Sequence, residues 1–330
     1  MTRAYVTREI YPEGLEILTK GVNTIEVWDR DEQIPRDVLL REIANADGVL
    51  TLLTERVDEE FLAHAPRCKV VANMAVGYNN IDVEACTRRG VLVTNTPGVL
   101  TETTADLAFA IMMAAARYVG AGIDYVKEGR WKTWSPSLFI GRDIHHATLG
   151  ILGLGRIGHE MAKRGRGFDM NVLYYDVRRR PDLELQYGYQ YVDFDTLLRE
   201  SDFLSVHVDL NPGTHRLIDA TALAKMKPTA YLVNAARGPI VDTEALYRAL
   251  VDGRLGGAAL DVTDPEPLPA DHPLLKLENV VVVPHIASAS LETRTAMAVL
   301  AARNLVAALR GEPPPTPVNS EVLTRAPART

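Results

Sequence analysis

The chain has 330 residues, a hydrophobic content of 47% and a formal net charge of -7, so it is long enough for two domains with a core each. The acidic balance and the lack of a long basic block argue against binding to nucleic acid or to an anionic membrane surface. The longest strongly apolar stretch, residues 107–116, falls short of the roughly 20 residues that span a membrane and is predicted to form a buried helix.

The N-terminal segment MTRAYVTREI is too polar for the apolar core of a signal peptide, which favours a cytoplasmic protein. Cys68 and Cys86 have no CxxC spacing and no cluster of histidines nearby. We therefore expect reduced, structural thiols and no bound metal.

Residues 1 to about 100 alternate between short β-rich runs and helix-like segments. The runs are AYVTR, TIEVWD, GVLTLL, CKVVANM and GVLVTNT, and the segments between them include PEGLEILTKG and VDEEFLAHAP. This alternation is typical of βαβ units.

A long apolar helix, predicted over about residues 102–118, and a Trp-containing loop lead to a second series of runs. These are ATLGIL, NVLYYD, FLSVHV, AYLVNA, GGAALD and NVVVVPH, whose nearly continuous apolar character predicts a parallel sheet buried on both faces. A last helix is predicted over about residues 291–310, followed by the proline-rich GEPPPTPVN, which we expect to have no core of its own.

The most informative motif is ATLGILGLGRIGHEMAKRG, in which Gly153, Gly155 and Gly158 stand between a strand and a helix. Such glycines allow a tight turn, close approach of the backbone to a diphosphate, and close helix packing. The diphosphate then lies at the positive end of the helix. Because Asp176 also ends the next strand, we predict a dinucleotide site; a plain glycine-rich turn would leave Asp176 unexplained.

Ligands of such sheets bind beyond the carboxyl ends of the strands, where later runs lead to Arg237, Glu266 and His285. Arginine can hold a carboxylate with two hydrogen bonds, and histidine can exchange a proton with a carbonyl oxygen. Glu266 lies in backbone stiffened by Pro265 and Pro267, where it would orient His285 and favour its protonated form. Each residue alone is more often a surface or loop residue, but together they predict an anion clamp and an acid–base pair.

The remaining histidines carry less information. His207 follows a strand and is expected to edge the cofactor pocket. His145 and His146 form a loop pair without a carboxylate ligand pattern, and His159 lies on the helix after the glycine loop, so no chemistry is assigned to them.

With these motifs in place, the chain resembles the D-isomer-specific 2-hydroxyacid dehydrogenases, most closely their glyoxylate/hydroxypyruvate reductase branch. The resemblance covers nearly the whole chain. It is carried by VANMAVGYNNID, TNTPGVLTETTADLAFA, WKTWSPSLFIGRDI, GILGLGRIG, VNAARGPIVD, GAALDVTDPEPLPADHPLL, VVPHIASAS and LRGEPPP.

The resemblance implies an α/β fold of two domains with the active site in the cleft between them. Residues 101–286 would form a Rossmann domain, a doubly wound parallel sheet that binds NAD, and residues 1–100 plus 287–330 a flavodoxin-like substrate domain. The implied reaction reduces glyoxylate and hydroxypyruvate to glycolate and D-glycerate, with hydride transfer from the nicotinamide to C2 of the substrate.

The resemblance also implies roles for individual residues. Arg237 would bind the 2-oxoacid, His285 would be the general acid/base and Glu266 its partner. Substrate-binding residues would further include Leu53, the amides of Val76 and Gly77, and Trp134. The cofactor-binding residues expected from motif, strand ends and resemblance together are Thr104, Gly153, Leu154, Gly155, Arg156, Ile157, Gly158, Asp176, His207, Val208, Thr214, Ala235, Ala236, Arg237, Asp261, His285 and Ser288.

Trp134 lies in the arm that family members use to dimerise, so we expect a homodimer in which this side chain reaches the partner subunit's site; the alternative is ordinary interface packing.

Two positions depart from the family pattern. Asp209 stands where proline is usual, and Asp176 stands where relatives that prefer NADPH tend to carry a small or hydroxyl residue followed by arginine, whereas Val177 follows here. We expect NAD(H) to be preferred over NADP(H), although the arginine run 178–180 could turn toward a 2′-phosphate.

Two alternatives stay open. Within the enzyme class, the substrate could be another 2-oxoacid, such as that of phosphoglycerate dehydrogenases, although the chain lacks the regulatory domain that many of those carry. Formate dehydrogenase relatives are disfavoured because they place an amide where Glu266 stands. In a different class, some relatives are cofactor-sensing corepressors, which usually carry extended polar tails.

Overall fold

The computed structural model describes residues 1–324 and divides into two compact units. Unit 1 consists of residues 1–100 and the described residues from Ala289 onward, and unit 2 of Thr101–Ser288. The expected boundary after residue 286 thus lies two residues before the one in the structure. The physical reason is that the Ala287 amide donates a hydrogen bond to the Asp261 carboxylate at 3.0 Å, which holds this segment to unit 2.

Unit 1 contains a parallel five-stranded sheet in the order β2-β1-β3-β4-β5, which is the strand order of flavodoxin-like sheets. All five predicted runs form its strands. The strands are β1 (Arg3–Val6), β2 (Thr24–Val27), β3 (Gly48–Thr51), β4 (Val70–Asn73) and β5 (Leu92–Thr94). The helices are α1 (Pro12–Gly21), α2 (Arg36–Glu42), η1 (Ile43–Asn45), α3 (Glu59–His64), α4 (Val83–Arg88), α12 (Leu291–Leu309) and α13 (Glu321–Thr324).

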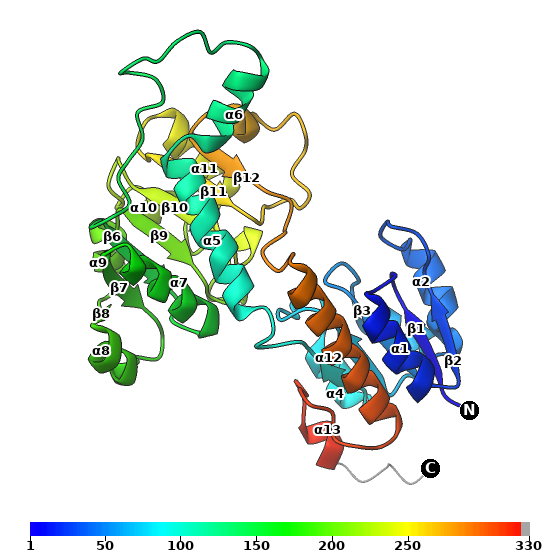
Figure 1. Ribbon diagram of the computed structural model, residues 1–330. Helices are drawn as coiled ribbons and strands as arrows, with labels where there is room; N and C mark the ends of the chain where they lie inside the picture. The colour runs from blue at the N-terminus through cyan, green and yellow to red at the C-terminus, as the bar shows by residue number, and fades with distance from the viewer. Residues whose placement is uncertain (325–330) are drawn as a thin grey trace. The chain divides into compact units, whose positions relative to one another are not determined.

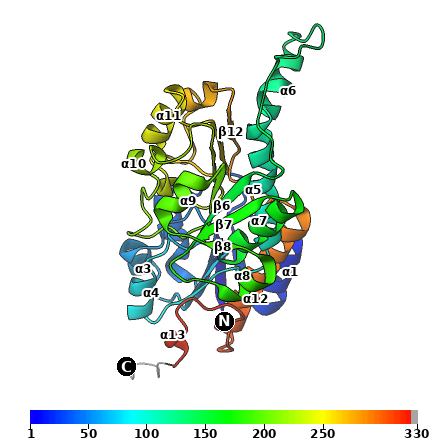
Figure 2. The same cartoon turned by 90° about the vertical axis from the view of Figure 1, so that its left-hand side faces the viewer.

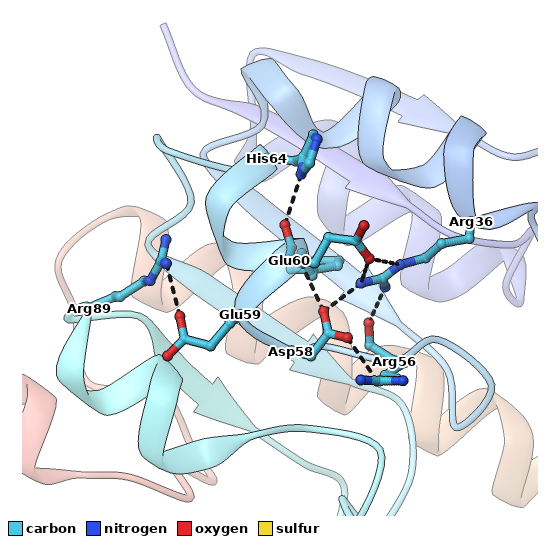
Figure 3. A network of polar contacts seen from close by, with 8 residues as sticks. Arg36, Arg56, Asp58, Glu59, Glu60, His64 and Arg89 are labelled. Carbon is cyan, nitrogen blue, oxygen red and sulfur yellow. Dashed lines mark hydrogen bonds and ion pairs between the residues drawn. The ribbon is translucent and has the colours of Figure 1, made fainter.

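A network of ion pairs fixes the start of α3, just beyond the loop that follows β3 (Figure 3). Asp58 caps the helix by accepting a hydrogen bond from the Phe61 amide, and it pairs with Arg36 of α2 and with Arg56. Arg36 also pairs with Glu60 and donates to the Arg56 carbonyl. Exposed pairs of this kind stabilise weakly one by one, so their effect here is to hold α2 and the loop end in one arrangement.

The sequence predicted that the proline-rich segment after the last long helix has no core of its own. In the structure, the C-terminal part of the described chain packs against the rest of unit 1. Helix α12 lies beside α1 (Figure 1), and an added Cβ at Gly14 would meet Ala298 at 2.9 Å, so this crossing requires glycine. Beyond α12, Pro317 forms a β-bridge with Thr94. The buried Asn319 side chain accepts a hydrogen bond from the Val93 amide at 2.7 Å, and Val318 packs against the apolar core of unit 1.

Unit 2 contains a parallel seven-stranded sheet in the order β12-β11-β10-β9-β6-β7-β8. The predicted fold class, α/β with a Rossmann doubly wound parallel sheet and a second, flavodoxin-like domain, is confirmed. The strands are β6 (Thr148–Leu152), β7 (Asn171–Tyr175), β8 (Gln190–Tyr191), β9 (Phe203–Val206), β10 (Tyr231–Asn234), β11 (Gly257–Leu260) and β12 (Val280–Val282). Only the short edge strand β8 was not predicted.

Helices cover both faces of this sheet. One apolar core lies under α5 (Thr101–Ala116) and α7 (Arg156–Gly167), and a second lies under α9 (Phe194–Glu200), α10 (Ala220–Leu223) and α11 (Thr243–Val251). The predicted apolar helix is therefore α5, and its buried face forms part of the first core. The other helical elements are α6 (Val119–Lys127), α8 (Pro181–Tyr187), η2 (Gly238–Ile240) and η3 (Pro273–Lys276).

Helix α6 and the loop after it project from the rest of unit 2 (Figure 2). No residue of α6 is buried, and large apolar side chains of this arm are exposed. They are Val119, Ile123, Val126, Trp131, Trp134 and Ile140.

Within residues 1–324, no single helix is both long and apolar enough to cross a membrane; α5 and α6 meet that criterion only as a pair, bent by 64°. Among residues 1–324, no three or more His, Cys, Asp or Glu side chains are grouped so that they could hold a metal ion. Cys68 and Cys86 are free and buried, and burial raises the pKa of each thiol to about 12.

Candidate functional site

The glycine loop between β6 and α7 leaves room for a ligand. Gly153 has a φ of 94°, and an added Cβ there would meet the His207 backbone at 3.0 Å. At Gly158 a Cβ would meet the Gly153 carbonyl oxygen at 2.1 Å, so the helix packs onto the loop only with glycine. At Gly155, the N-cap of α7, nothing lies within 4 Å of an added Cβ. A diphosphate can therefore approach the free amides of the helix start.

Asp176 follows β7 and is fixed by two backbone amides. Its Oδ2 accepts a hydrogen bond from Leu154 of the glycine loop at 2.7 Å, and its Oδ1 accepts one from Arg178 at 2.9 Å. Each carboxylate oxygen can accept a further hydrogen bond. The carboxylate is thus held beside the glycine loop with acceptor capacity left for ribose hydroxyls.

The loop after β9 also borders the glycine loop. His207 Nε2 and the Ser205 hydroxyl are hydrogen-bonded at 2.8 Å. The Nδ1 atom of His207 is buried without a partner in the described chain. Burial lowers the pKa of His207 to about 4, so the ring is neutral at physiological pH. The Thr214 hydroxyl donates to the Asp209 carbonyl and closes the turn that follows β9.

Arg237 follows β10 and is positioned by its neighbours. The buried Asn234 side chain donates to the Arg237 carbonyl at 2.9 Å and accepts from the Ala236 amide at 3.0 Å. An added Cβ at Gly238 would lie 1.9 Å from the Thr263 carbonyl oxygen. Glycine at this position therefore lets the Arg237 loop pass directly against the segment that leads to Glu266.

Glu266 and His285 form a hydrogen-bonded pair, with 2.6 Å between Glu266 Oε1 and His285 Nδ1. His285 has a φ of 52°, which is uncommon for a residue other than glycine and must be held by its surroundings. Asp261 at the end of β11 supplies this hold. Its carbonyl accepts from the His285 amide at 2.9 Å, and its carboxylate accepts from Ile286 and Ala287 at 2.7 and 3.0 Å.

The charges of this cluster interact. Burial raises the pKa of Glu266, but the hydrogen bond and charge of His285, with the charge of Arg237, outweigh it, so the pKa is lowered overall. Burial lowers the pKa of Arg237, and the nearby charges of Glu266 and Asp209 oppose this shift. Arginine nonetheless stays charged at any working pH. Burial also raises the pKa of Asp261, although its backbone hydrogen bonds counteract this.

In unit 1, the residues expected to contact substrate follow strands β3 and β4. Leu53 is 36% exposed, and its loop is held by the buried Glu55, whose carboxylate accepts from the Leu52 amide and the Thr7 hydroxyl, both at 2.7 Å. Val76 and Gly77 are partly buried in the loop after β4. Within residues 1–324, neither of their amides donates a hydrogen bond to another protein group.

The other predicted residues are scattered through unit 2. Thr104 is buried in the first turn of α5, and Ala235 and Ala236 lie in the loop after β10. Ser288 is the last residue of the unit, three residues beyond His285. Trp134 lies in the arm and is 78% exposed.

Comparison with known proteins decides the family. The model of the D-isomer specific 2-hydroxyacid dehydrogenase NAD binding domain matches residues 109–287. This chain belongs to that family. It is an NAD(P)-dependent dehydrogenase that binds a nicotinamide dinucleotide, and the resemblance seen in the sequence is confirmed.

Several proteins named as glyoxylate reductases are similar to this chain over nearly their whole length. The chain is 50% identical to a glyoxylate reductase of Korarchaeum cryptofilum over 322 residues, 97% of each protein. A glyoxylate reductase structure from Paecilomyes thermophila matches with a TM-score of 0.86 and 32% identity, covering 97% of this chain and 99% of that one. An NADPH-dependent glyoxylate/hydroxypyruvate reductase of Sinorhizobium meliloti, in complex with NADP and malonate, matches with 0.84 and 31%, covering 99% of both.

Sequence reasoning missed the residues of this dehydrogenase that support the site. Asn234 and Gly238 flank Arg237 within the quoted motif VNAARGPIVD, but no role was assigned to them. Asp261 was expected to bind cofactor, which stays a prediction; in the structure both of its carboxylate oxygens also hold the turn after His285, a supporting role that the sequence did not suggest. For Asn234, the available signal was a polar residue at the end of an otherwise apolar buried strand.

Proposed function

We propose that this chain reduces glyoxylate and hydroxypyruvate to glycolate and D-glycerate, with Arg237, Glu266 and His285 as the residues that bind and protonate the substrate. The observation that carries the proposal is the Glu266–His285 hydrogen bond of 2.6 Å beside the Arg237 loop. The identity of 50% to a glyoxylate reductase supports this substrate class. When bound, the reduced nicotinamide supplies the hydride.

His285 is the proposed proton donor. With Nδ1 engaged by Glu266, its Nε2 is the nitrogen left to deliver a proton to the carbonyl oxygen of the substrate. The ionised Glu266 stabilises the protonated ring and fixes its orientation, as in other pairs of a carboxylate and a catalytic histidine.

Arg237 and the amides of Val76 and Gly77 are the proposed partners of the substrate carboxylate. The fork of a guanidinium matches the two oxygens of a carboxylate, and Arg237 is held by the Asn234 side chain. The two amides of unit 1 have no partner within the described chain, and adjacent backbone N–H groups bind anions.

The proposed cofactor is NADH rather than NADPH. The fixed carboxylate of Asp176 would accept hydrogen bonds from ribose hydroxyls and repel a 2′-phosphate. Two of the three arginines that could offset this repulsion are engaged: Arg179 binds both oxygens of Glu184, and Arg180 pairs with Asp182. The Sinorhizobium relative is NADPH-dependent, so both cofactors have to be compared in the assay of this chain.

A homodimer formed through the projecting arm is also proposed, because exposed apolar side chains such as Trp134 favour burial against another surface. Whether Trp134 then reaches the partner subunit's substrate stays a prediction, as does the cytoplasmic location.

A panel assay tests the proposed function. Turnover would be measured with glyoxylate, hydroxypyruvate, pyruvate and phosphohydroxypyruvate, each with NADH and with NADPH. We expect the highest kcat/KM for glyoxylate or hydroxypyruvate with NADH. A clear preference for another 2-oxoacid would favour the alternative dehydrogenase activity, and cofactor binding without turnover of any 2-oxoacid would favour a sensing role.

A further inference from the structure

The two amides proposed to bind the substrate carboxylate are oriented by the carbonyl groups of their own peptide bonds. The Ala75 carbonyl accepts a hydrogen bond from the Thr96 amide at 2.9 Å, and the Val76 carbonyl accepts one from Asn95 Nδ2 at 2.8 Å. In a trans peptide the C=O and the following N–H point in opposite directions. Because Asn95 and Thr96 both follow β5, both carbonyls face that loop and the amides of Val76 and Gly77 face away from it.

Asn95 is itself anchored by helix α12 and by the segment that follows it. Its carbonyl accepts hydrogen bonds from Asn304 Nδ2 of α12 at 3.1 Å and from the Thr316 hydroxyl at 2.6 Å. Asn304 is fully buried and also bonds the side chain and amide of Thr316. This buried polar cluster gives the Asn95 side chain a fixed origin from which to reach Val76.

We propose that Asn95 is a positioning residue for substrate binding: anchored by Asn304 and Thr316, its side chain aims the Gly77 amide at the substrate carboxylate. This inference rests on the proposed role of the Val76 and Gly77 amides. Removing the side-chain donor frees the peptide between these two residues to rotate, and binding must then restore its orientation. The Val76 amide keeps its direction through the Thr96 backbone bond, so only part of the carboxylate binding is lost.

The expected signature is a change in KM without a matching change in kcat. Asn95→Ala should raise the KM for glyoxylate about tenfold, the scale of one hydrogen bond to a charged group, and leave the dissociation constant of NADH unchanged. Asn95→Asp keeps the size of the side chain, which favours an intact fold, but offers no donor to the Val76 carbonyl. It should raise KM at least as much.

Asn279→Ala provides the matched control. Asn279 is also partly buried, and its Nδ2 donates to a carbonyl, that of Gly256, at 2.9 Å. It lies before β12, at the amino ends of the strands of unit 2 and thus at the opposite sheet edge from His285. Its loss should lower the melting temperature to a similar extent without raising KM.

The outcomes separate this inference from the proposed function. A KM of Asn95→Ala and Asn95→Asp equal to that of Asn279→Ala, in an unaltered protein that does reduce glyoxylate, overturns the positioning role alone. A fall in kcat with constant KM overturns it as well. No glyoxylate turnover by the unaltered protein with either cofactor overturns the proposed function and, with it, this inference.

Discussion

Replacing Glu266 with glutamine should move the alkaline limit of the reduction to lower pH. Glutamine keeps the shape of the side chain and a possible hydrogen bond to His285 but removes the negative charge at 2.6 Å from its ring. The protonated imidazole loses more from this change than the neutral one. The pH above which kcat/KM falls therefore decreases.

The size of this shift follows from the geometry. Hydrogen bonds to charged groups contribute about 1.5–3 kcal/mol. The side chains of His285 and Glu266 are 24% and 36% exposed, so solvent screening reduces this to the lower end of the range. Since about 1.4 kcal/mol corresponds to a factor of ten, kcat/KM on the alkaline side of the profile should fall about tenfold, because only the protonated ring donates a proton.

The assay is the pH dependence of kcat/KM for glyoxylate, which reports on protonation in the free enzyme. Glu278→Gln is the control: it removes a charge from an exposed residue before β12, at the other end of the strand from His285. An alkaline limit that stays in place in a folded Glu266→Gln protein would refute the reasoning and leave Glu266 with a structural role only.

Three further predictions concern substrate, cofactor and acid stability. Arg237→Lys keeps the charge but loses the two-pronged geometry, so the KM for glyoxylate should rise about tenfold or more; an unchanged KM means that the carboxylate is bound elsewhere. Asp176→Ser should shift the kcat/KM ratio toward NADPH, and a constant ratio contradicts the assigned role. Hydrogen bonds from Arg179 and Tyr174 lower the pKa of Glu184 from 4.5 to about 2, so this acid stabilises the fold above pH 4.5 and loses that effect as the pH falls toward 2. Glu184→Gln should therefore show a smaller decrease in melting temperature across this interval, and an equal decrease would contradict the link.

The fold was largely predictable because buried parallel strands leave a strong signal. Each of the six apolar runs of unit 2 became a strand, since both faces of its sheet are covered by helices. The edge strand β8 has two exposed residues, Gln190 and Tyr191, and therefore no apolar pattern to detect. The return of the segment around Pro317 to β5 depends on polar contacts between residues far apart in the chain, which local patterns do not encode.

For the site, the sequence allowed prediction of residues that carry chemistry but not of those that position them. Glu266 and His285 were paired by their place after neighbouring strands, and the structure has them hydrogen-bonded. The contact of Asn95 with the Val76 carbonyl joins loops after two different strands. This hydrogen bond forms only because the folded backbone turns the Val76 carbonyl toward Asn95, and no local sequence pattern encodes that direction.

The most direct test of the proton-transfer role is the turnover of His285→Ala with glyoxylate and NADH, with the dissociation constant of NADH measured alongside. His145→Ala, which removes an exposed histidine of a loop, serves as the control. We predict that kcat falls by about a hundredfold to ten-thousandfold, the range lost with a general acid, while NADH affinity stays nearly constant. Turnover close to that of His145→Ala in a folded His285→Ala protein would contradict the account.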